Sequence, residues 1–294
     1  MTPLRVALIG AGSMAANHAR VVASSATAML AVVIDRDARR AEQLAHRWGA
    51  DSTTALDRAF GCDAAVIATS TPAHAQAALA LIDAGVPVLV EKPLTSSLAD
   101  TRGVIAASHD RGVALMCGFV ERFNSPYRQL IMRAGGRPSN IGTVRIGPTP
   151  VQAHSSVVDD VLLHDLDLVL RLTQGDDVCE MSAHALAWCV RNDWPDAVTC
   201  TLTFASGTTA GLHASRVSAI QERAITIVEQ DGTHHRADLL EMPGDPLAAQ
   251  FDRFVWLVRD GSAAEQDAER ASILPSHELA HRIQEHLADA VSVT

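Results

Sequence analysis

One short stretch near the start of the chain, residues 6–15, constrains the fold more than any other. It reads Val-Ala-Leu-Ile-Gly-Ala-Gly-Ser-Met-Ala, an apolar run followed at once by a G-x-G-x-x-A pattern. The apolar run predicts a buried strand, and the residues from Met14 to Ser24 predict a helix. Gly10 permits the tight turn, Gly12 lets a pyrophosphate approach the helix N-terminus, and Ala15 allows close helix–strand packing. The stretch therefore predicts a dinucleotide-binding unit.

A second apolar run, Met29 to Ile34, ends in Asp35, about twenty residues past Ala15, which is the spacing of the dinucleotide fingerprint. An acid there can accept hydrogen bonds from the adenosine ribose hydroxyls, which favours NAD. Arg36 follows directly, and a guanidinium at that strand end is how NADP enzymes bind the 2′-phosphate. We expect NAD to be preferred, because the strand end fixes Asp35 while Arg36 can turn to solvent. The cofactor contacts expected from the glycine-rich stretch and the second strand are Gly10, Gly12, Ser13, Met14, Asp35 and Arg36.

The composition limits the partners of the chain. Its 294 residues are 48% hydrophobic, and 24 Lys and Arg stand against 34 Asp and Glu, a formal charge of −10. This balance argues against nucleic acid as the main partner, whereas a helix N-terminus can bind a nucleotide cofactor without net positive charge. No apolar run is long enough to span a bilayer, and the first residues predict a strand rather than a targeting leader. We therefore expect a soluble, cytoplasmic protein.

The five cysteines are odd in number, and no pair has the C-x-x-C spacing. We expect buried thiols in a reducing compartment rather than disulfides or zinc ligands.

The first part of the chain, residues 1–118, alternates strand and helix signals. This alternation predicts parallel strands joined by right-handed crossovers, an α/β Rossmann fold with a doubly wound sheet. Strands are expected at 4–9, 29–34, 64–68, 86–90 and 113–118, with helices at 14–24, 37–48, 73–84 and 97–111.

The second part, residues 119–294, predicts an α+β domain with an open, mostly antiparallel sheet. Its runs are rich in Val and Thr, and Asp231-Gly232 is a strong hairpin signal. Expected strands cover 142–147, 178–190, 197–205, 208–218, 223–230 and 234–240, and expected helices cover 158–173, 246–259 and 276–291. We assign dinucleotide binding to the first domain, and substrate binding and oligomerisation to the second. A homodimer or homotetramer through the second sheet is expected, since its apolar strands would be only half covered by helices.

Polar residues follow two neighbouring strands of the first domain. Ligands of an open α/β sheet bind outside the carboxyl ends of its strands. Lys92, in Glu91-Lys92-Pro93, is therefore expected beside the reactive end of the cofactor, although a solvated lysine at a strand end is an alternative. The run Thr69-Ser70-Thr71-Pro72 ends the preceding strand on the same rim, where it either lines the cofactor or forms a turn.

Asp160 and His164 are four residues apart in the expected helix 158–173, so both lie on one helix face. A carboxylate one turn away can orient a histidine and raise its basicity, which suits a general base. The alternative is a histidine that makes a structural hydrogen bond. No third ligand stands at a standard metal spacing, so we expect no metal site.

Four motifs in this order carry a resemblance to a known family: Gly10-Ala-Gly12-Ser-Met14, Thr71-Pro72-Ala-His74, Glu91-Lys92-Pro93 and Asp160-x-x-x-His164-Asp165. As a set they resemble the Gfo/Idh/MocA oxidoreductase family, which acts mainly on sugars and cyclitols. The resemblance implies an N-terminal Rossmann domain and a C-terminal open sheet that carries substrate and often makes the oligomer interface. It also implies that Lys92 contacts substrate and that His164, with Asp160 beside it, accepts the proton. The cofactor contacts expected from the Thr71-Pro72-Ala-His74 and Glu91-Lys92-Pro93 motifs and the residues before them are Thr69, Ser70, Thr71, Pro72, His74, Glu91 and Lys92.

A narrower resemblance rests on Gly118-Phe-Val-Glu-Arg122-Phe-Asn124, Gly147-Pro148-x-Pro150 and His164-Asp165-Leu-Asp167. These motifs are similar to the branch that contains UDP-N-acetylglucosamine 3-dehydrogenases. The chain departs from that branch where Ser125 separates Asn124 from Pro126. Arg122 and Asn124 are candidate substrate contacts, and a structural hydrogen bond is the alternative for both.

The function expected from these residues is reversible hydride transfer between NAD and a secondary carbinol of a sugar, nucleotide sugar or cyclitol. One alternative is a catalytically inactive, nucleotide-sensing regulatory protein of the same fold. The joint presence of Lys92, Asp160 and His164 argues against it, because a sensor needs none of them. A Rossmann enzyme that uses S-adenosylmethionine is a second alternative, which the Glu-Lys-Pro strand end and the open second sheet disfavour.

Overall fold

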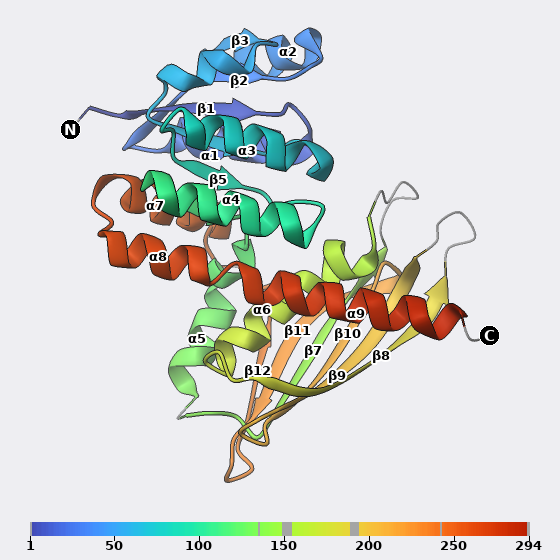
Figure 1. The fold of residues 1–294 in the computed structure, drawn as a ribbon. Helices are drawn as coiled ribbons and strands as arrows, with labels where there is room; N and C mark the ends of the chain where they lie inside the picture. The colour runs from blue at the N-terminus through green and yellow to red at the C-terminus, as the bar shows by residue number, and fades with distance from the viewer. Residues whose placement is uncertain (1, 135, 149–154, 189–193, 242, 293–294) are drawn as a thin grey trace. The chain divides into compact units, whose positions relative to one another are not determined.

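The chain folds into two compact units, as seen in a computed structural model that describes residues 2–134, 136–148, 155–188, 194–241 and 243–292 (Figure 1). The first unit comprises Met1–Val120 and Leu247–Leu274, and the second comprises Glu121–Pro246 and Pro275–Thr294.

The first unit is built on a six-stranded parallel sheet with strand order β3-β2-β1-β4-β5-β6. Apart from the edge strand β3, its strands are nearly continuous runs of mostly buried apolar residues, as expected for a parallel sheet covered on both faces. The strands are β1 (Leu4–Ile9), β2 (Ala28–Ile34), β3 (Asp51–Thr53), β4 (Ala64–Ile67), β5 (Val88–Val90) and β6 (Leu115–Cys117). The expected doubly wound α/β fold is confirmed, and β3 is an additional short strand at one edge.

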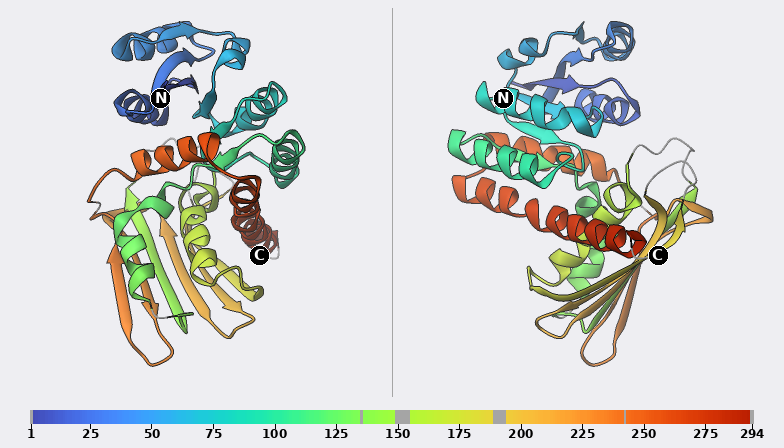
Figure 2. Two further views of the ribbon diagram at one scale, coloured as in Figure 1. Left: turned by 90° about the vertical axis from the view of Figure 1, so that its left-hand side faces the viewer. Right: turned by 45° about the vertical axis from the view of Figure 1, so that its right-hand side comes forward.

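Helices cover both faces of this sheet. The strand order reverses between β1 and β4, so right-handed crossovers place α1 and α2 on one face and α3 and α4 on the other (Figure 2). Asp37 caps α2 by accepting hydrogen bonds from the backbone N–H groups of Arg39 and Arg40. The helices are α1 (Ser13–Ser24), α2 (Ala38–Trp48), α3 (His74–Asp83) and α4 (Leu98–Arg111), with the short helices η1 (Leu56–Gly61) and η2 (Thr71–Ala73).

Two helices from late in the sequence, α7 (Pro246–Arg259) and α8 (Ala263–Ala271), also belong largely to the first unit. Arg259 donates hydrogen bonds to the backbone carbonyl oxygens of Thr2 and Thr27, and Arg270 donates to that of Val113. Residues 119–294 are therefore divided between the two units, and the assignment of substrate binding to that range stays a prediction.

The second unit contains a six-stranded mixed sheet with strand order β12-β11-β7-β10-β9-β8. Among the described strand pairs of this sheet, β7–β10 is parallel and the others are antiparallel. The expected open, mostly antiparallel sheet is therefore confirmed. The strands are β7 (Asn140–Pro148), β8 (Val178–Trp188), β9 (Pro195–Phe204), β10 (Thr209–Ser215), β11 (Val217–Val228) and β12 (His234–Asp238). Residues 189–190 of one expected strand, and Pro150, lie outside the described residues.

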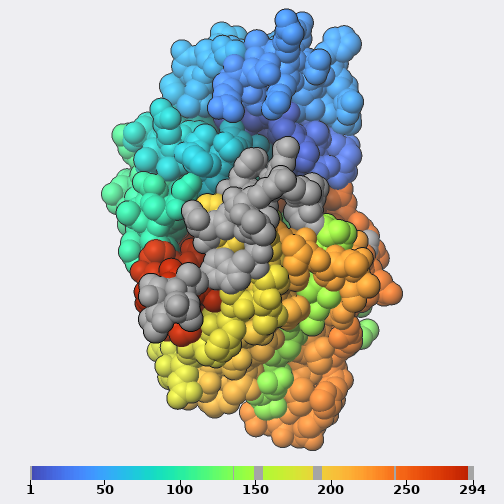
Figure 3. Space-filling model, turned by 90° about the vertical axis from the view of Figure 1, so that its right-hand side faces the viewer, coloured from blue at the N-terminus to red at the C-terminus, as the bar shows by residue number. Residues whose placement is uncertain are grey.

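The helical elements of the second unit are η3 (Val120–Phe123), α5 (Ser125–Arg133), η4 (Val158–Leu162), α6 (Leu163–Leu172) and α9 (Leu274–Ser292). One face of the sheet buries Ile141, Leu202, Leu212 and Ile225 against this helical layer. The opposite face forms part of the molecular surface, where green, yellow and orange atoms of this unit are visible in Figure 3.

Within the described ranges, no helix combines the length and the apolar character needed to cross a membrane. The described cysteines are free thiols, of which Cys62, Cys117 and Cys200 are buried. Cys179 is exposed, contrary to the expectation of buried thiols, and Cys189 lies outside the described residues.

Candidate active site

The glycine-rich turn after β1 has the geometry that the sequence predicts. Gly10 has a φ of +109°, and a Cβ placed there would lie 2.5 Å from the backbone oxygen of Ala68. Only glycine fits this turn, because a side chain would strain the backbone and strike the neighbouring strand. Gly12 is the N-cap of α1, and no side chain among the described residues caps that end. The free amide groups and positive dipole end of this twelve-residue helix suit a pyrophosphate.

Asp35 is held in place at the end of β2. Its carboxylate accepts a hydrogen bond of 2.7 Å from the backbone N–H of Ala11 and one of 2.9 Å from that of Asp37. The side chain of Arg36, by contrast, is exposed. The carboxylate is thus tied to the glycine-rich turn itself, the position from which it would meet an adenosine ribose.

The rim at the ends of β4 and β5 divides into accessible and buried residues. Thr69 and Thr71 are half-buried, and Ser70 and Pro72 are exposed, so all four can still line a cofactor. His74 is only 1% exposed, and its Nδ1 and Nε2 lie 3.0 and 3.2 Å from the backbone oxygens of Pro93 and Thr69. Both ring nitrogens thus face backbone oxygens, and the expected cofactor contact of His74 stays a prediction.

Glu91 is also turned inward. Its Oε1 lies 2.6 Å from Nε2 of His18, and its Oε2 accepts a hydrogen bond from the backbone N–H of Lys92. The carboxylate is thus engaged within the protein, and the expected cofactor contact of Glu91 stays a prediction. Lys92 follows β5 and is half-buried.

The sequence predicts one regular α-helix that carries Asp160 and His164, but the structure has an irregular one. Residues Val158–Leu162 form a π-helical turn, η4, that leads into α6. Single π-turns within helices occur frequently at functional sites. His164 is half-buried, and Oδ2 of Asp160 lies 3.8 Å from Nη1 of Arg216. The roles of Asp160 and His164 stay predictions.

A buried charge cluster anchors α6 within the second unit. Arg145, on β7, donates hydrogen bonds of 2.9 Å to Asp165 and 2.7 Å to Glu121. Burial raises the pKa of the Asp165 carboxyl, an effect that the Arg145 charge opposes. Burial disfavours the charge of Arg145, but Asp165 and Glu121 outweigh it and raise the pKa of the guanidinium. The cluster thus pins the residue next to His164 to the sheet.

Arg122 and Asn124 belong to the same buried region. Arg122 donates hydrogen bonds of 2.8 and 2.5 Å to the two carboxylate oxygens of Asp167, also on α6. Asn124 is fully buried and donates to Glu121 and to the backbone oxygen of Leu239. These hydrogen bonds agree with the structural alternative for both residues, and the expected substrate contacts stay predictions.

Sequence reasoning missed this cluster, although a signal for it exists. Arg145 interrupts the apolar run Val144-Arg-Ile, and Asp165 and Asp167 interrupt a leucine-rich helix. Charged residues at such positions are seldom fully buried unless they are paired, so they could have been matched with one another.

The first unit, with its glycine-rich turn, its uncapped α1 and its strand-end acid, defines a dinucleotide-binding protein of the Rossmann class, and a family model agrees. The model described as "Oxidoreductase family, NAD-binding Rossmann fold" (GFO_IDH_MocA) matches residues 4–119. A UDP-N-acetylglucosamine 3-dehydrogenase from Acidithiobacillus ferrooxidans is 32% identical over 234 residues, which cover 79% of this chain and 73% of that protein. A myo-inositol dehydrogenase from Streptomyces leeuwenhoekii is 32% identical over 63% of this chain and 60% of that protein.

A solved structure is similar over nearly the whole chain. It is that of the UDP-N-acetylglucosamine 3-dehydrogenase from Acidithiobacillus ferrooxidans, with a TM-score of 0.88 and 26% identity. The similarity covers 98% of this chain and 99% of that one. The chain therefore belongs to the Gfo/Idh/MocA oxidoreductase family.

Proposed function

We propose that this oxidoreductase transfers a hydride between NAD and a secondary carbinol of a sugar, nucleotide sugar or cyclitol. A UDP-N-acetylhexosamine that reacts at C3 is the first candidate substrate, because the relative with 32% identity over 79% of this chain is a UDP-N-acetylglucosamine 3-dehydrogenase. The similarity to a myo-inositol dehydrogenase makes cyclitols the second candidates.

The observation that carries the proposal is the identity of residue 92. Lys92 is the only lysine in the chain, and the other 23 of its 24 basic residues are arginines. A compact ammonium can donate to a single oxygen from a half-buried position, whereas a guanidinium is a broad, planar fork. The single position at which the chain has lysine in place of arginine is thus the strand end at which an open α/β sheet binds its ligand.

The residues of the chain divide the chemistry between them. NAD, when bound, supplies the hydride acceptor. His164 takes the proton of the substrate hydroxyl, and Asp160 orients His164 and stabilises its cationic form. Lys92 donates a hydrogen bond to the reacting oxygen and stabilises the negative charge that develops there. General acid–base catalysis of this kind contributes about 10²–10⁴ in rate.

The preference for NAD over NADP rests on Asp35. Two backbone N–H groups fix its carboxylate beside the glycine-rich turn, at 2.7 and 2.9 Å. A 2′-phosphate would meet this negative charge at close range, and the exposed Arg36 would have to compensate for it.

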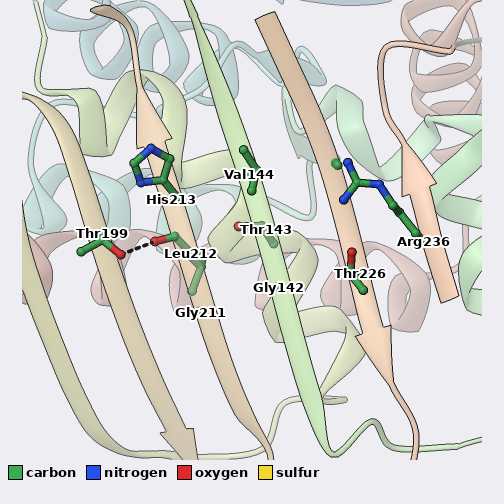
Figure 4. Close-up of a pocket in the computed structure, with 10 residues that line it drawn as sticks. Gly142, Thr143, Val144, Thr199, Gly211, Leu212, His213, Thr226 and Arg236 are labelled. Atoms are coloured by element: carbon green, nitrogen blue, oxygen red, sulfur yellow. Dashed lines mark hydrogen bonds between the residues drawn. The ribbon is translucent and has the colours of Figure 1, made fainter. Parts of the chain in front are cut away.

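We also propose that a second copy of the chain covers the open face of the second sheet. Figure 4 shows the depression on this face, which is lined by Gly142, Gly211, Thr199 and Thr226. In their described parts, β7, β9 and β10 direct no Asp, Glu, Lys or Arg to this face, whereas Arg236 of the edge strand β12 lines the margin of the depression and Glu222 lies on β11 beside it. An uncharged centre with a charged rim is typical of a protein–protein interface.

A substrate panel tests the proposed reaction. Purified protein is given NAD⁺ or NADP⁺ with UDP-N-acetylglucosamine, UDP-N-acetylgalactosamine, myo-inositol or scyllo-inositol, and nicotinamide reduction is followed by absorbance. We expect turnover with at least one member of the panel, and loss of that turnover in Lys92→Arg. Binding of NAD⁺ without turnover of any sugar or cyclitol would favour the regulatory alternative instead.

A further inference from the structure

Two buried histidines hold the residues on either side of Lys92. His18 and His74 are 0% and 1% exposed, and they come from α1 and α3, which pack on opposite faces of the parallel sheet (Figure 2). His18 pairs with Glu91, which precedes Lys92, and His74 pairs with Pro93, which follows it. Both imidazoles lie against protein atoms that flank Lys92, so they can act on the site through the backbone that they hold.

The His18 contact fixes the Glu91 side chain. Nε2 of His18 lies 2.6 Å from Oε1 of Glu91, while Oε2 of Glu91 accepts the backbone N–H of Lys92. The space around this carboxylate is tight, since a Cβ at Gly118 would lie 2.8 Å from the same Oε2. A glycine at 118 therefore lets the carboxylate fold back against the strand end and bind the Lys92 amide.

The His74 contacts join two strand ends. Its Nδ1 lies 3.0 Å from the backbone oxygen of Pro93, and its Nε2 lies 3.2 Å from that of Thr69. A neutral imidazole donates to only one of these two oxygens, and an imidazolium donates to both; with the proton on Nδ1, the ring holds the segment after Lys92 through Pro93. Because His74 is the first residue of α3, this helix supports the position of its imidazole.

We propose that His18 and His74 are positioning residues that together fix the backbone of Lys92, and with it the placement of its ammonium. The proposal rests on the proposed function, in which Lys92 donates to the reacting oxygen. A catalytic group that is misplaced by about 1 Å can lose about 10² in rate, so two rigid supports on one short turn have a catalytic use.

The two contacts use different ring nitrogens, which gives a sharp test. The amide nitrogen of glutamine reaches about as far as Nε2 of histidine, and that of asparagine about as far as Nδ1. The His18 contact with Glu91 uses Nε2, so His18→Gln keeps this contact and His18→Asn loses it. The His74 contact with Pro93 uses Nδ1, so His74→Asn keeps this contact and His74→Gln loses it. The same pair of substitutions must therefore have opposite effects at the two positions.

The first readout needs no substrate. As Lys92 is the only lysine, acetic anhydride followed by mass spectrometry of the peptide that contains it reports the reactivity of one side-chain amine. We expect the acetylation rate to rise about threefold or more in His18→Asn and His74→Gln, because the turn loosens, and to stay within about 1.5-fold of wild type in His18→Gln and His74→Asn. Equal rates in all four variants would overturn the proposal.

The second readout is kinetic, with whichever substrate of the panel turns over. The two contact-losing variants should lower kcat about tenfold or more while the Kd of NAD⁺ stays within about twofold. In a Lys92→Ala background the same substitutions should have little further effect, since residues that act through one group are not additive. Additive losses of kcat in that background would make both histidines merely structural.

Ser108→Ala is the matched control. Ser108 is a fully buried residue of the same unit whose hydroxyl donates to the backbone oxygen of Val113, and neither contacts the Glu91–Pro93 segment in any described hydrogen bond. It should lower the thermal midpoint without changing acetylation or kcat. The arms separate the two claims: full kcat in Lys92→Ala refutes the catalytic role of Lys92, whereas the acetylation pattern tests the positioning by itself.

Discussion

His164 is the residue on which the proposed proton transfer depends. We expect His164→Ala to lower kcat by about two orders of magnitude or more, the usual scale for the loss of a general base, while NAD⁺ binding stays near normal. Steady-state kinetics and fluorescence titration measure the two quantities. His286→Ala, an exposed histidine of α9 in the same unit, serves as the control and should change neither. Unchanged turnover in His164→Ala would remove this residue from the mechanism.

Asp35 is the residue that decides between the two nicotinamide cofactors. We expect kcat/KM to favour NAD over NADP by about tenfold or more, because an uncompensated charge contact costs at least about 1.4 kcal/mol. Asp35→Ser should shift the ratio towards NADP, since Arg36 is then free to bind the 2′-phosphate without a competing carboxylate.

Asp37→Ser is the control for this substitution. Asp37 lies two residues away and caps α2, a role that serine also fills, so its replacement should leave the ratio unchanged. Equal use of both cofactors by the wild type would show that Arg36 determines the preference.

At the scale of elements, the placement of α6 depends on the buried charges of Arg145, Glu121 and Asp165. Arg145→Met removes the cation that donates to both carboxylates, and the loss of this buried partner is expected to cost about 3–5 kcal/mol of unfolding free energy. Urea denaturation measures this loss. Arg111→Met breaks an exposed pair with Asp83 and should cost about 0–1 kcal/mol. If the two substitutions cost the same, the cluster does not anchor the helix.

The elements that the sequence predicts well are those with a long, regular apolar pattern. The five expected parallel strands and α1 to α4 lie within a few residues of their expected ranges. Among the strands and α-helices described, β3, α5 and α8 were missed. β3 and α5 are short and bury few side chains, and α8 buries only Arg270, so none has a clear apolar period. The pattern Ser262-x-x-Glu265, which forms a capping box, could have located α8.

The site was predictable where its residues are close in sequence and less so where they are not. Gly10, Gly12 and Asp35 belong to one fingerprint whose spacing is set by a single βαβ unit. The π-turn before α6 has no signal in the apolar period, because its residues also suit an α-helix. The pairing of His18 with Glu91 spans 73 residues, and no local pattern indicates which buried carboxylate a histidine will meet.

At the scale of the whole molecule, the open face of the second sheet should carry the contact between copies. We expect a dimer or tetramer at micromolar concentration and its dissociation in Gly211→Arg. Gly211 is exposed, and a Cβ there meets nothing within 4 Å, so the arginine fits the single chain but obstructs a facing copy. Light scattering measures the mass. Gly103→Arg, an equally open glycine on α4 of the first unit, is the matched control and should leave the mass unchanged. A monomeric wild type would contradict the proposal.

The central claim, hydride transfer from a sugar carbinol to NAD, is tested most directly by following the hydrogen itself. UDP-N-acetylglucosamine deuterated at C3 is incubated with the protein and NAD⁺, and the reduced cofactor is analysed by mass spectrometry. We predict that the deuterium appears on the nicotinamide ring with the wild type. With Lys92→Ala and His164→Ala, the amount of deuterium transferred to the ring should fall strongly. Bound NAD⁺ that stays unreduced with this substrate and with deuterated inositols would contradict the account.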